Sequence, residues 1–371
     1  MKYKLSDICH YRKGKVDVSL LTDDTYISTE NMMPNRGGIT KATTLPTVDS
    51  TQLYKKGDVL VSNIRPYFKK IWQATCDGGC SNDVLVFQAN EGFDQDYLYY
   101  VLSDDAFFAY AMKTSKGTKM PRGDKHSIMQ YETEVCDLDT QRKIASLLKS
   151  IDGKIELNNA INNNLMQQAR LLFKSWFVDY LPFGCIVPTD WQTMTLGEVS
   201  NMSAGGDKPK VVTQYRDETC KYPIYSNGLS DDGLYGYTNE PKIFDESVTV
   251  SARGTIGFVC LRHIPYVPIV RLVTLVPKAN VMDAKYLYLY LNQLHIRGTG
   301  TTQQQLTVPD FRKTTILVPT KSVLDHFSDI VTPLFTKKWA NDEENSSLAD
   351  LRNTLLPKLL SGELDVSDID L

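Results

Sequence analysis

The sequence lacks the features that mark membrane and secreted proteins. No run of about 18 apolar residues occurs, so no membrane-spanning helix is expected. Residues 1–15 carry no apolar core of a secretion signal. The seven cysteines are odd in number and scattered, which favours a reducing compartment over a disulfide framework. We therefore expect a cytoplasmic protein.

Metal-binding and catalytic signatures are also missing. Cys76 and Cys80 are the only close pair of cysteines, and no second pair or paired histidines accompany them, so a turn between strands is favoured over a zinc site. None of the five histidines has metal-ligand spacing to another. There is no Gly-x-x-x-x-Gly-Lys-Ser/Thr loop for nucleoside triphosphates, no Asn/Asp-Pro-Pro-Tyr/Phe motif of adenine methyltransferases and no glycine-rich nucleotide site. We expect no catalytic residue, no metal and no cofactor bound by this chain.

The composition is that of a globular protein. Hydrophobic residues make up 42% and charged residues 23% of the 371 positions, and this length favours two or more domains. The net charge of −3 argues against a surface covered in basic residues. It leaves nucleic-acid binding open, because local clusters of Lys and Arg are enough to contact phosphates.

The chain contains an internal repeat, which can be seen when the sequence is laid upon itself. At an offset of 189 residues, 59–62 align with 248–251 and 97–102 with 286–291. From Gly117-Thr118, which matches Gly300-Thr301, the offset becomes 183 and persists to Leu172 and Leu355. The matches keep their order and share local patterns, so the two halves are predicted to have the same fold.

Each half has the same order of expected elements. Short β runs come first, such as 58–62 and 247–251, followed by an aromatic helix at 97–110 or 285–294, a Gly-Thr loop, and a β run ending at Val135 or Val318. The spacing of Tyr97 and Tyr286 makes these aromatic residues core rather than base-stacking groups. A long segment with helical periodicity closes each half. We predict an α/β (α+β) protein with two pseudo-symmetric globular domains separated by two long helices. The expected boundaries are 1–137 for the first domain, 138–180 for the central helix, 181–319 for the second domain, 320–364 for the C-terminal helix and 365–371 for a tail.

The two long helices carry matching apolar seams. From Ile144 to Trp176 the seam positions alternate steps of four and three residues, and the pattern returns 183 residues later. Asparagines interrupt both seams in the middle, where Asn158 matches Asn341 and Asn162 matches Asn345. Polar layers at the midpoint favour an antiparallel coiled coil of the two helices, because only the midpoint then faces itself. The alternative is that each helix packs on its own domain and the asparagines are solvated.

Residues 173–177 at the end of the first helix are too apolar for an isolated helix, so we expect them to bury against the other helix or a partner subunit. The residues assigned to the helix pair and subunit interface are Ile144, Leu148, Ile151, Ile155, Asn158, Asn162, Leu165, Leu172, Phe173, Trp176, Phe177, Leu334, Asn341, Asn345, Leu348, Leu355 and Leu359.

The whole chain resembles the specificity (S) subunits of type I restriction–modification systems. The strings that carry the resemblance are Gln141-Arg-Lys-Ile-Ala145, Leu172-Phe-Lys-Ser-Trp-Phe177, Pro188-Thr-Asp-Trp191 with Leu196-Gly-Glu-Val199, and Leu355-Leu-Pro-Lys-Leu-Leu-Ser-Gly-Glu-Leu364. The first domain matches only loosely, as expected for domains that each read different DNA.

The resemblance implies a protein that recognises double-stranded DNA and leaves the chemistry to other chains. Each globular domain would be a target recognition domain for one half of a bipartite site. Two modification subunits would dock on the helices and methylate adenine N6, and restriction (motor-nuclease) subunits would join them. S-adenosylmethionine, ATP and Mg²⁺ would bind to those partners and not to this chain.

DNA contacts are expected on loops, where phosphate contacts set the position and side-chain donors read base edges. In the first domain we select the loop around Gly117, and in the second the segment from Arg297 to Gln305, where glutamine can pair with adenine. Residues after the matching strands are a second group. The candidates are Lys116, Gly117, Thr118, Lys119, Arg122, Lys125, Ser62, Arg65, Ser251, Arg253, Arg297, Thr299, Gly300, Thr301, Thr302, Gln303, Gln304 and Gln305.

Three alternatives remain open on the residues alone. The Gly-Thr loops could be solvated polar loops without a ligand. The chain could be a non-catalytic scaffold or DNA mimic that uses the same coiled coil, although Lys116, Lys119 and Arg122 oppose the acidic loops that a mimic needs. It could also be a self-sufficient nuclease or methyltransferase with an unfamiliar site.

Overall fold

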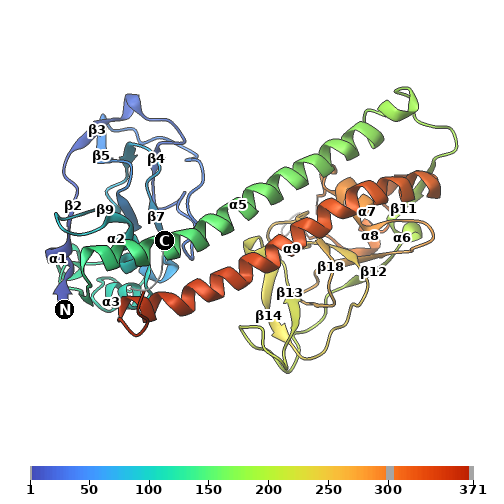
Figure 1. Cartoon of the computed structure of the whole chain (residues 1–371). Helices are drawn as coiled ribbons and strands as arrows, with labels where there is room; N and C mark the ends of the chain where they lie inside the picture. Colours follow the sequence, from blue (N-terminus) through green and yellow to red (C-terminus); the bar gives the residue numbers. More distant parts are fainter. Residues whose placement is uncertain (1, 298–304, 367–371) are drawn as a thin grey trace. The chain divides into compact units, whose positions relative to one another are not determined.

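The computed structural model describes residues 2–297 and 305–366. Contacts divide the chain into two compact units. Unit 1 is formed by the residues up to Asn158 together with those from Glu343 onward, and unit 2 by Asn159–Asp342. Each unit therefore contains a globular part and one segment of each long helix (Figure 1). No helix in the described ranges is long and apolar enough to cross a membrane.

Unit 1 is built on two four-stranded sheets. The first has the order β2 (Cys9–Tyr11), β9 (Val84–Ala89), β6 (Val59–Ser62) and β7 (Ile71–Gln73), all antiparallel. The second has the order β3 (Lys15–Asp17), β5 (Ser50–Tyr54), β8 (Gly78–Cys80) and β4 (Tyr26–Ile27). A separate pair joins β1 (Lys2–Lys4) to β10 (Glu132–Glu134). All four residues of β6 are buried, as expected for a strand covered on both faces.

The close cysteine pair belongs to this second sheet. Cys80 lies in β8, and Cys76 precedes that strand and contacts the Tyr54 hydroxyl at 3.9 Å. Gly79 is required in β8, because a Cβ there would come within 2.7 Å of side chains from Thr51, Leu21 and Val16. Close packing of strands therefore accounts for this segment.

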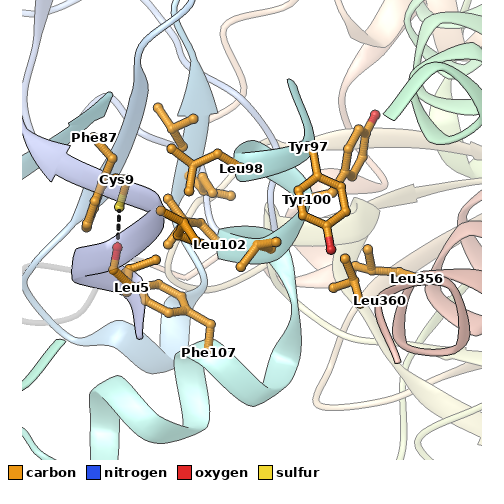
Figure 2. Packing of buried hydrophobic residues seen from close by; sticks show 14 of the residues in the cluster. Leu5, Cys9, Phe87, Tyr97, Leu98, Tyr100, Leu102, Phe107, Leu356 and Leu360 are labelled. Carbon is orange, nitrogen blue, oxygen red and sulfur yellow. Dashed lines mark hydrogen bonds between the residues drawn. The ribbon is translucent and has the colours of Figure 1, made fainter. Parts of the chain in front are cut away.

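Helices cover the first sheet of unit 1. They are α1 (Leu5–Ile8), α2 (Gln95–Ser103), α3 (Asp105–Lys113) and α4 (Lys125–Ile128), with 3-10 turns η1 (Val18–Leu20) and η2 (Pro66–Phe68). The single helix expected at 97–110 is instead two helices, because Asp104 adopts an extended backbone and its side chain caps α3. Tyr97 and Tyr100 are buried, which confirms their place in the core. Figure 2 shows them beside Leu356 and Leu360, which come from the far end of the chain.

Unit 2 repeats the first sheet of unit 1. Its order is β12 (Ser200–Ala204), β18 (Val273–Pro277), β15 (Ser247–Val250) and β16 (Val259–Arg262). A three-stranded sheet has the order β14 (Leu234–Thr238), β13 (Tyr222–Tyr225) and β17 (Val267–Pro268), and β11 (Gln192–Thr195) pairs with β19 (Thr315–Val318). The shorter elements are α6 (Leu196–Val199), α7 (Ala284–Leu291), α8 (Val308–Phe311), η3 (Leu181–Phe183) and η4 (Ser230–Gly233).

The repeat extends to single hydrogen bonds. Asp94 caps α2 by accepting from the Tyr97 amide, and Asp283, 189 residues later, caps α7 by accepting from the Tyr286 amide. The Tyr286 hydroxyl donates to the Leu317 carbonyl at 2.6 Å, while that of Tyr97 donates more weakly to the equivalent carbonyl at 3.4 Å. The predicted duplication is thus confirmed by the equal topology of one four-stranded sheet in each unit and by equivalent caps, whereas the second sheets differ in strand number.

The two long helices are α5 (Leu138–Phe177) and α9 (Lys321–Leu360). In unit 1 the Asn158 amide donates to Asn345 at 3.0 Å, and Asp152 accepts from Arg352 at 2.7 Å. The residue numbers of the α9 partners rise as those of the α5 residues fall, so the two segments are antiparallel.

In unit 2 the Asn341 amide donates to Asn162 at 2.8 Å, and near the end of α5 the ring of Phe173 contacts Phe327, which gives the same direction. The expected antiparallel pair is confirmed within each unit. The midpoint asparagines bond across the helix pair to each other and to Glu344 and Asp342.

Candidate nucleic-acid interface

In unit 1 the glycine loop is fastened to the segment that follows β6. Lys116 and Arg122 exchange backbone hydrogen bonds of 2.9 Å, which closes the loop between them. The Arg65 amide donates to the Pro121 carbonyl at 2.8 Å. Gly117 has a φ of +90°, a conformation that side chains disfavour. The structure therefore brings together the candidate loop and the candidate residues after the strand.

Ion pairs hold two of the basic side chains of this loop. Lys116 pairs with Asp124 at 2.6 Å, and Arg122 pairs with Asp83 at 2.8 Å. The hydrogen bond from Lys116 and the backbone amide of Ser127 hold the pKa of Asp124 below its usual range. Both cations remain largely exposed, with side-chain exposures of 82% and 57%. They can exchange these carboxylates for phosphate oxygens, because exposed ion pairs contribute little to stability.

The other unit 1 candidates differ in exposure. Gly117, Thr118, Lys119 and Lys125 are exposed. Ser62 is 3% exposed and its hydroxyl donates to the Ile64 carbonyl, so its side chain supports the loop and is not an available donor. Arg65 is half-buried with a φ of +50°.

In unit 2, Arg253 lies in the segment after β15 and Gln305 lies in the loop segment, where it matches Arg122 of unit 1. The guanidinium of Arg253 donates to the Gln305 side-chain oxygen at 3.0 and 3.2 Å. Ser251 is 2% exposed and is therefore a supporting residue like Ser62. Arg297 is exposed and lines a hollow of about 300 Å³ with Asp310 and Phe311. Thr299, Gly300, Thr301, Thr302, Gln303 and Gln304 lie outside the described residues.

The described residue at the end of each loop makes an equivalent backbone hydrogen bond in the two units. The Gly123 amide donates to the Asn63 carbonyl at 3.0 Å, and the Leu306 amide donates to the Ala252 carbonyl at 3.0 Å. These pairs match at both offsets of the repeat. A Cβ at Gly123 would lie 2.6 Å from the Asn63 side chain. In unit 2 the large residue Leu306 replaces Gly123, and the small residue Ala252 replaces Asn63. The two loops are thus anchored at equivalent points by different packing.

Sequence reasoning missed an exposed aromatic group beside this loop. Tyr67 and Phe68, in η2, are 48% and 37% exposed, and their rings lie 4.6 Å apart. They directly follow Arg65, whose amide is bonded to the loop. The signal was the sequence Arg-Pro-Tyr-Phe-Lys-Lys after a strand, which combines aromatic rings with cations in the manner of nucleic-acid surfaces.

A second missed feature of unit 1 is a polar hollow of about 410 Å³. Its lining includes Ser28, Glu30 and Asp83. Asp83 also pairs with Arg122 of the loop, so the hollow and the loop share a residue. The residues of this hollow carry no recognisable motif in the sequence.

The aromatic end of α5 is part of the unit 2 core. Phe173 and Phe177 are buried, and Trp176 is half-buried. Rings of all three lie within 6.2 Å of the Phe327 ring of α9. Just beyond the helix, Leu181 and Ile186 are 57% and 72% exposed, which leaves apolar surface next to this cluster.

Comparisons with known proteins agree with these observations. Residues 1–167 and 188–338 match a family model described as the type I restriction modification DNA specificity domain. The type I restriction enzyme HindI specificity subunit of Haemophilus influenzae is 24% identical, and the alignment covers 98% of this chain and 99% of that one. The MjaIX specificity subunit of Methanocaldococcus jannaschii is 24% identical over 86% of this chain and 80% of its own length.

A solved structure has the same fold. The crystal structure of the S subunit of a type I restriction–modification system from M. genitalium aligns with a TM-score of 0.63 and 18% identity, covering 99% of this chain and 96% of that one. This likeness confirms the predicted architecture of two α/β domains with long paired helices.

Proposed function

This chain belongs to the type I restriction–modification DNA specificity family, and we propose that its two units each read one half of a bipartite DNA site. Members of this family are the DNA-recognition components of their systems, and catalysis lies in other subunits. The reading regions in this proposal are residues 1–137 and 181–319. The helical segments 138–180 and 320–364 set the spacing between the half-sites.

The observation that carries the proposal is the equal anchoring of the two candidate loops. At the end of each loop one amide donates an equivalent backbone hydrogen bond to the short segment after β6 or β15, from Gly123 to Asn63 and from Leu306 to Ala252. A duplicated frame that carries different side chains suits a protein that reads two different half-sites with the same geometry. The exposed cations Lys116, Arg122 and Arg253 supply phosphate and base contacts.

The long helices suit the role of a spacer. A helix of 40 residues is roughly 60 Å long at 1.5 Å per residue. Half-sites read from one face of a duplex are separated by one helical turn or a multiple of it. A coiled coil of fixed register would keep this separation constant.

Two modification subunits dock on the helical regions in this proposal, one for each pseudo-equivalent half, and restriction subunits join the complex through them. Pseudo-two-fold symmetry in one chain allows two identical partners to bind equivalent surfaces. The exposed apolar residues Leu181 and Ile186 beside the aromatic end of α5 are available for such a contact. The partners carry S-adenosylmethionine, ATP and Mg²⁺.

The test is co-expression with a modification subunit from the same source, followed by genome-wide mapping of N6-methyladenine. We expect a single bipartite motif, methylated on opposite strands on either side of a fixed gap. Exchange of residues 1–137 for another recognition domain should change only one half of the motif. An active, assembled complex that methylates no defined motif would contradict the proposal and favour a scaffold or DNA mimic.

A further inference from the structure

A strained turn precedes β18, an inner strand of the four-stranded sheet of unit 2. In Ile269–Leu272, the Leu272 amide donates to the Ile269 carbonyl at 3.1 Å, and Val270 and Arg271 have φ of +53° and +61°. Two positive φ values define a type I′ turn, for which Asn-Gly is preferred. Positive φ is a genuine outlier for a β-branched residue such as valine. The sequence therefore has an unfavourable pair of residues in this turn.

The surrounding structure forces this conformation. Ile269 and Leu272 are 1% and 2% exposed and anchor both ends of the turn in the interior. The Arg271 amide donates to Gly205 at 2.8 Å, and the Val270 amide donates to Gly206 at 2.9 Å. A Cβ at Gly205 would lie 2.7 to 2.8 Å from the backbone of Ile269, so glycine is required for this approach. The strain is thus maintained by tertiary contacts.

In a comparable turn of unit 1, the arginine side chain bonds to other residues of the unit. Asn35 and Arg36 also have positive φ, and the Gly37 amide closes that turn on Pro34 at 3.1 Å. The guanidinium of Arg36 donates to the Ser103 carbonyl and to Asp105, so it ties the turn to the helices.

Arg271, the second positive-φ residue of the unit 2 turn as Arg36 is of the unit 1 turn, is exposed. Its side chain makes no hydrogen bond or ion pair with any residue that the structure describes. Strain held without an internal partner for the side chain is typical of functional positions.

The position of the turn connects it to the candidate interface. The side-chain amide of Asn227 donates to the Val270 carbonyl at 2.7 Å and accepts from the Ala252 amide at 2.7 Å. Ala252 is the residue to which the unit 2 loop is anchored, and Arg253 follows it. Asn227 therefore holds the strained turn and the segment bearing Arg253 in one arrangement.

Unit 1 has a different side chain at the equivalent place. At the offset of 189, Arg271 corresponds to Asn82, which is exposed and lies just before β9. Asparagine pairs with adenine and arginine with guanine in the major groove. An exchange of these two residue types at equivalent positions suits two half-sites of different sequence.

From these observations we infer that Arg271 contacts DNA in the half-site read by unit 2, and that Asn227 is the positioning residue for this contact. The inference rests on the proposed function and adds a contact that no motif in the sequence indicates. Arg271 acts beside Arg253, and the strained turn holds its side chain outward from a rigid backbone.

Glycine substitutions separate this role from a structural one. Arg271→Gly removes the side chain and also relieves the strain, because glycine adopts positive φ readily. Val270→Gly relieves the strain next to it and keeps the arginine. We expect both variants to be at least as heat-stable as the wild type, so a loss of DNA binding cannot be attributed to misfolding.

The experiment measures affinity of the complex with the modification subunit for duplexes that carry the mapped motif. Arg271→Gly should weaken binding by about five- to 150-fold, as a lost arginine–base pair does, while Val270→Gly stays within about twofold of the wild type. The half of the motif read by unit 2 is the half that stays unchanged when residues 1–137 are exchanged. If Arg271→Gly no longer distinguishes the bases at one pair in that half, Arg271 reads a base. A uniform loss with a shallower salt dependence indicates a phosphate contact.

Either form of the loss supports the inference. If the wild-type complex reads a bipartite motif and folded Arg271→Gly binds it with unchanged affinity and discrimination, the inference is wrong and the proposed function stands. If the wild-type complex binds DNA without a motif, the proposed function fails. The ratio of the wild-type affinity to the Arg271→Gly affinity for that DNA then still decides whether Arg271 contacts it. A wild-type complex that binds no DNA overturns both.

Discussion

At the residue scale, the buried asparagines of the helix pair are joined by hydrogen bonds that leave the Asn341 side-chain oxygen without a partner among the described residues. Asn162 and Asn341, both in unit 2, are 6% and 1% exposed. The amide of Asn341 donates to Asn162, whose own amide donates to Asp342 at 2.7 Å. A buried polar group costs the most free energy when it loses its partner. These residues therefore stabilise one register of the helices more than they stabilise the fold.

Replacement of one asparagine should be more damaging than replacement of both. Asn341→Leu leaves the Asn162 oxygen buried without its donor and should lower the free energy of unfolding of unit 2 by about 1–3 kcal/mol. The double variant Asn162→Leu with Asn341→Leu should recover most of this loss, because two apolar residues pack without unpaired groups. Urea unfolding monitored in unit 2 measures both, and Asn163→Leu, at an exposed position, is the control. A double variant as unstable as the single one would contradict this account.

The cysteines give a second prediction for single residues. Burial raises the pKa of the thiols of Cys80 and Cys260 to about 12, whereas Cys185 is exposed. At pH 8 only about one in 10⁴ of the buried thiols is ionised, and the thiolate is the reactive form. Iodoacetamide should modify Cys185 within minutes and leave the other two unmodified until the protein unfolds. Their ionisation should increase only as the pH rises toward 12. Peptide mass spectrometry measures this order, and fast labelling of Cys80 in the folded chain would refute it.

At the scale of elements, two charged side chains at seam positions of α9 have partners: Lys338 and Arg352, which match Ile155 and Ala169 of α5 at the offset of 183. Arg352 is half-buried and donates to Asp152 of α5, which also accepts from the Tyr100 hydroxyl of α2 at 2.8 Å. Lys338 pairs with Asp342 one turn along its own helix. The charged residues that weaken a simple apolar seam therefore connect the helix pair to the globular part of unit 1 or to their own helix.

The aromatic end of α5 should be the most sensitive part of this helix in unit 2. Trp176→Ala removes ring contacts with His326, Phe327 and Phe183. We expect a loss of about 2–4 kcal/mol, toward the lower end of fully buried aromatic residues because Trp176 is only half-buried. Leu171 lies on the same helix and is 57% exposed. Leu171→Ala should change the free energy of unfolding by less than about 0.5 kcal/mol. Thermal unfolding of both variants checks this, and equal effects would show that the ring contacts are unimportant.

The two ends of the chain share one core at the scale of the whole molecule. Leu356 and Leu360 of α9 are buried in the same cluster as Leu5 and Tyr100, although these residues are far apart in the sequence. Folding of unit 1 therefore depends on the last part of the chain. Such long-range contacts are formed late in synthesis and make folding slow.

Shortening these two leucines should loosen the N-terminal half of the sequence. Leu356→Ala with Leu360→Ala should destabilise unit 1 by several kcal/mol, since each buried leucine costs about 2–5 kcal/mol when it is reduced to alanine. Hydrogen exchange of α2 should become faster in this variant and remain unchanged in Leu351→Ala, whose side chain is 47% exposed. Unaltered exchange in α2 after the double substitution would show that α9 is dispensable for unit 1.

The sequence by itself determined the repeat and the two long helices, and it supplied the loops that we propose as the DNA interface. Periodicity and offsets are properties of the chain, and they identified the midpoint asparagines before any contact was known. The glycine loop around Gly117 was recognisable because glycine and clustered cations have local meaning. A single helix at 97–110 was wrong, since the break at Asp104 depends on a cap within an otherwise helical pattern.

Only the tertiary structure decided which residues meet and which are accessible. Ser62 ends β6 and Ser251 directly follows β15, yet burial prevents both hydroxyls from donating to DNA. Arg271 follows a β-branched valine and reads as part of a strand, because the positive φ of both residues is imposed by Gly205, Gly206 and Asn227 from elsewhere in the chain. Local preference opposes that turn, so no local pattern could predict it. Strain and burial are set by distant contacts, and these appear only when the chain is folded.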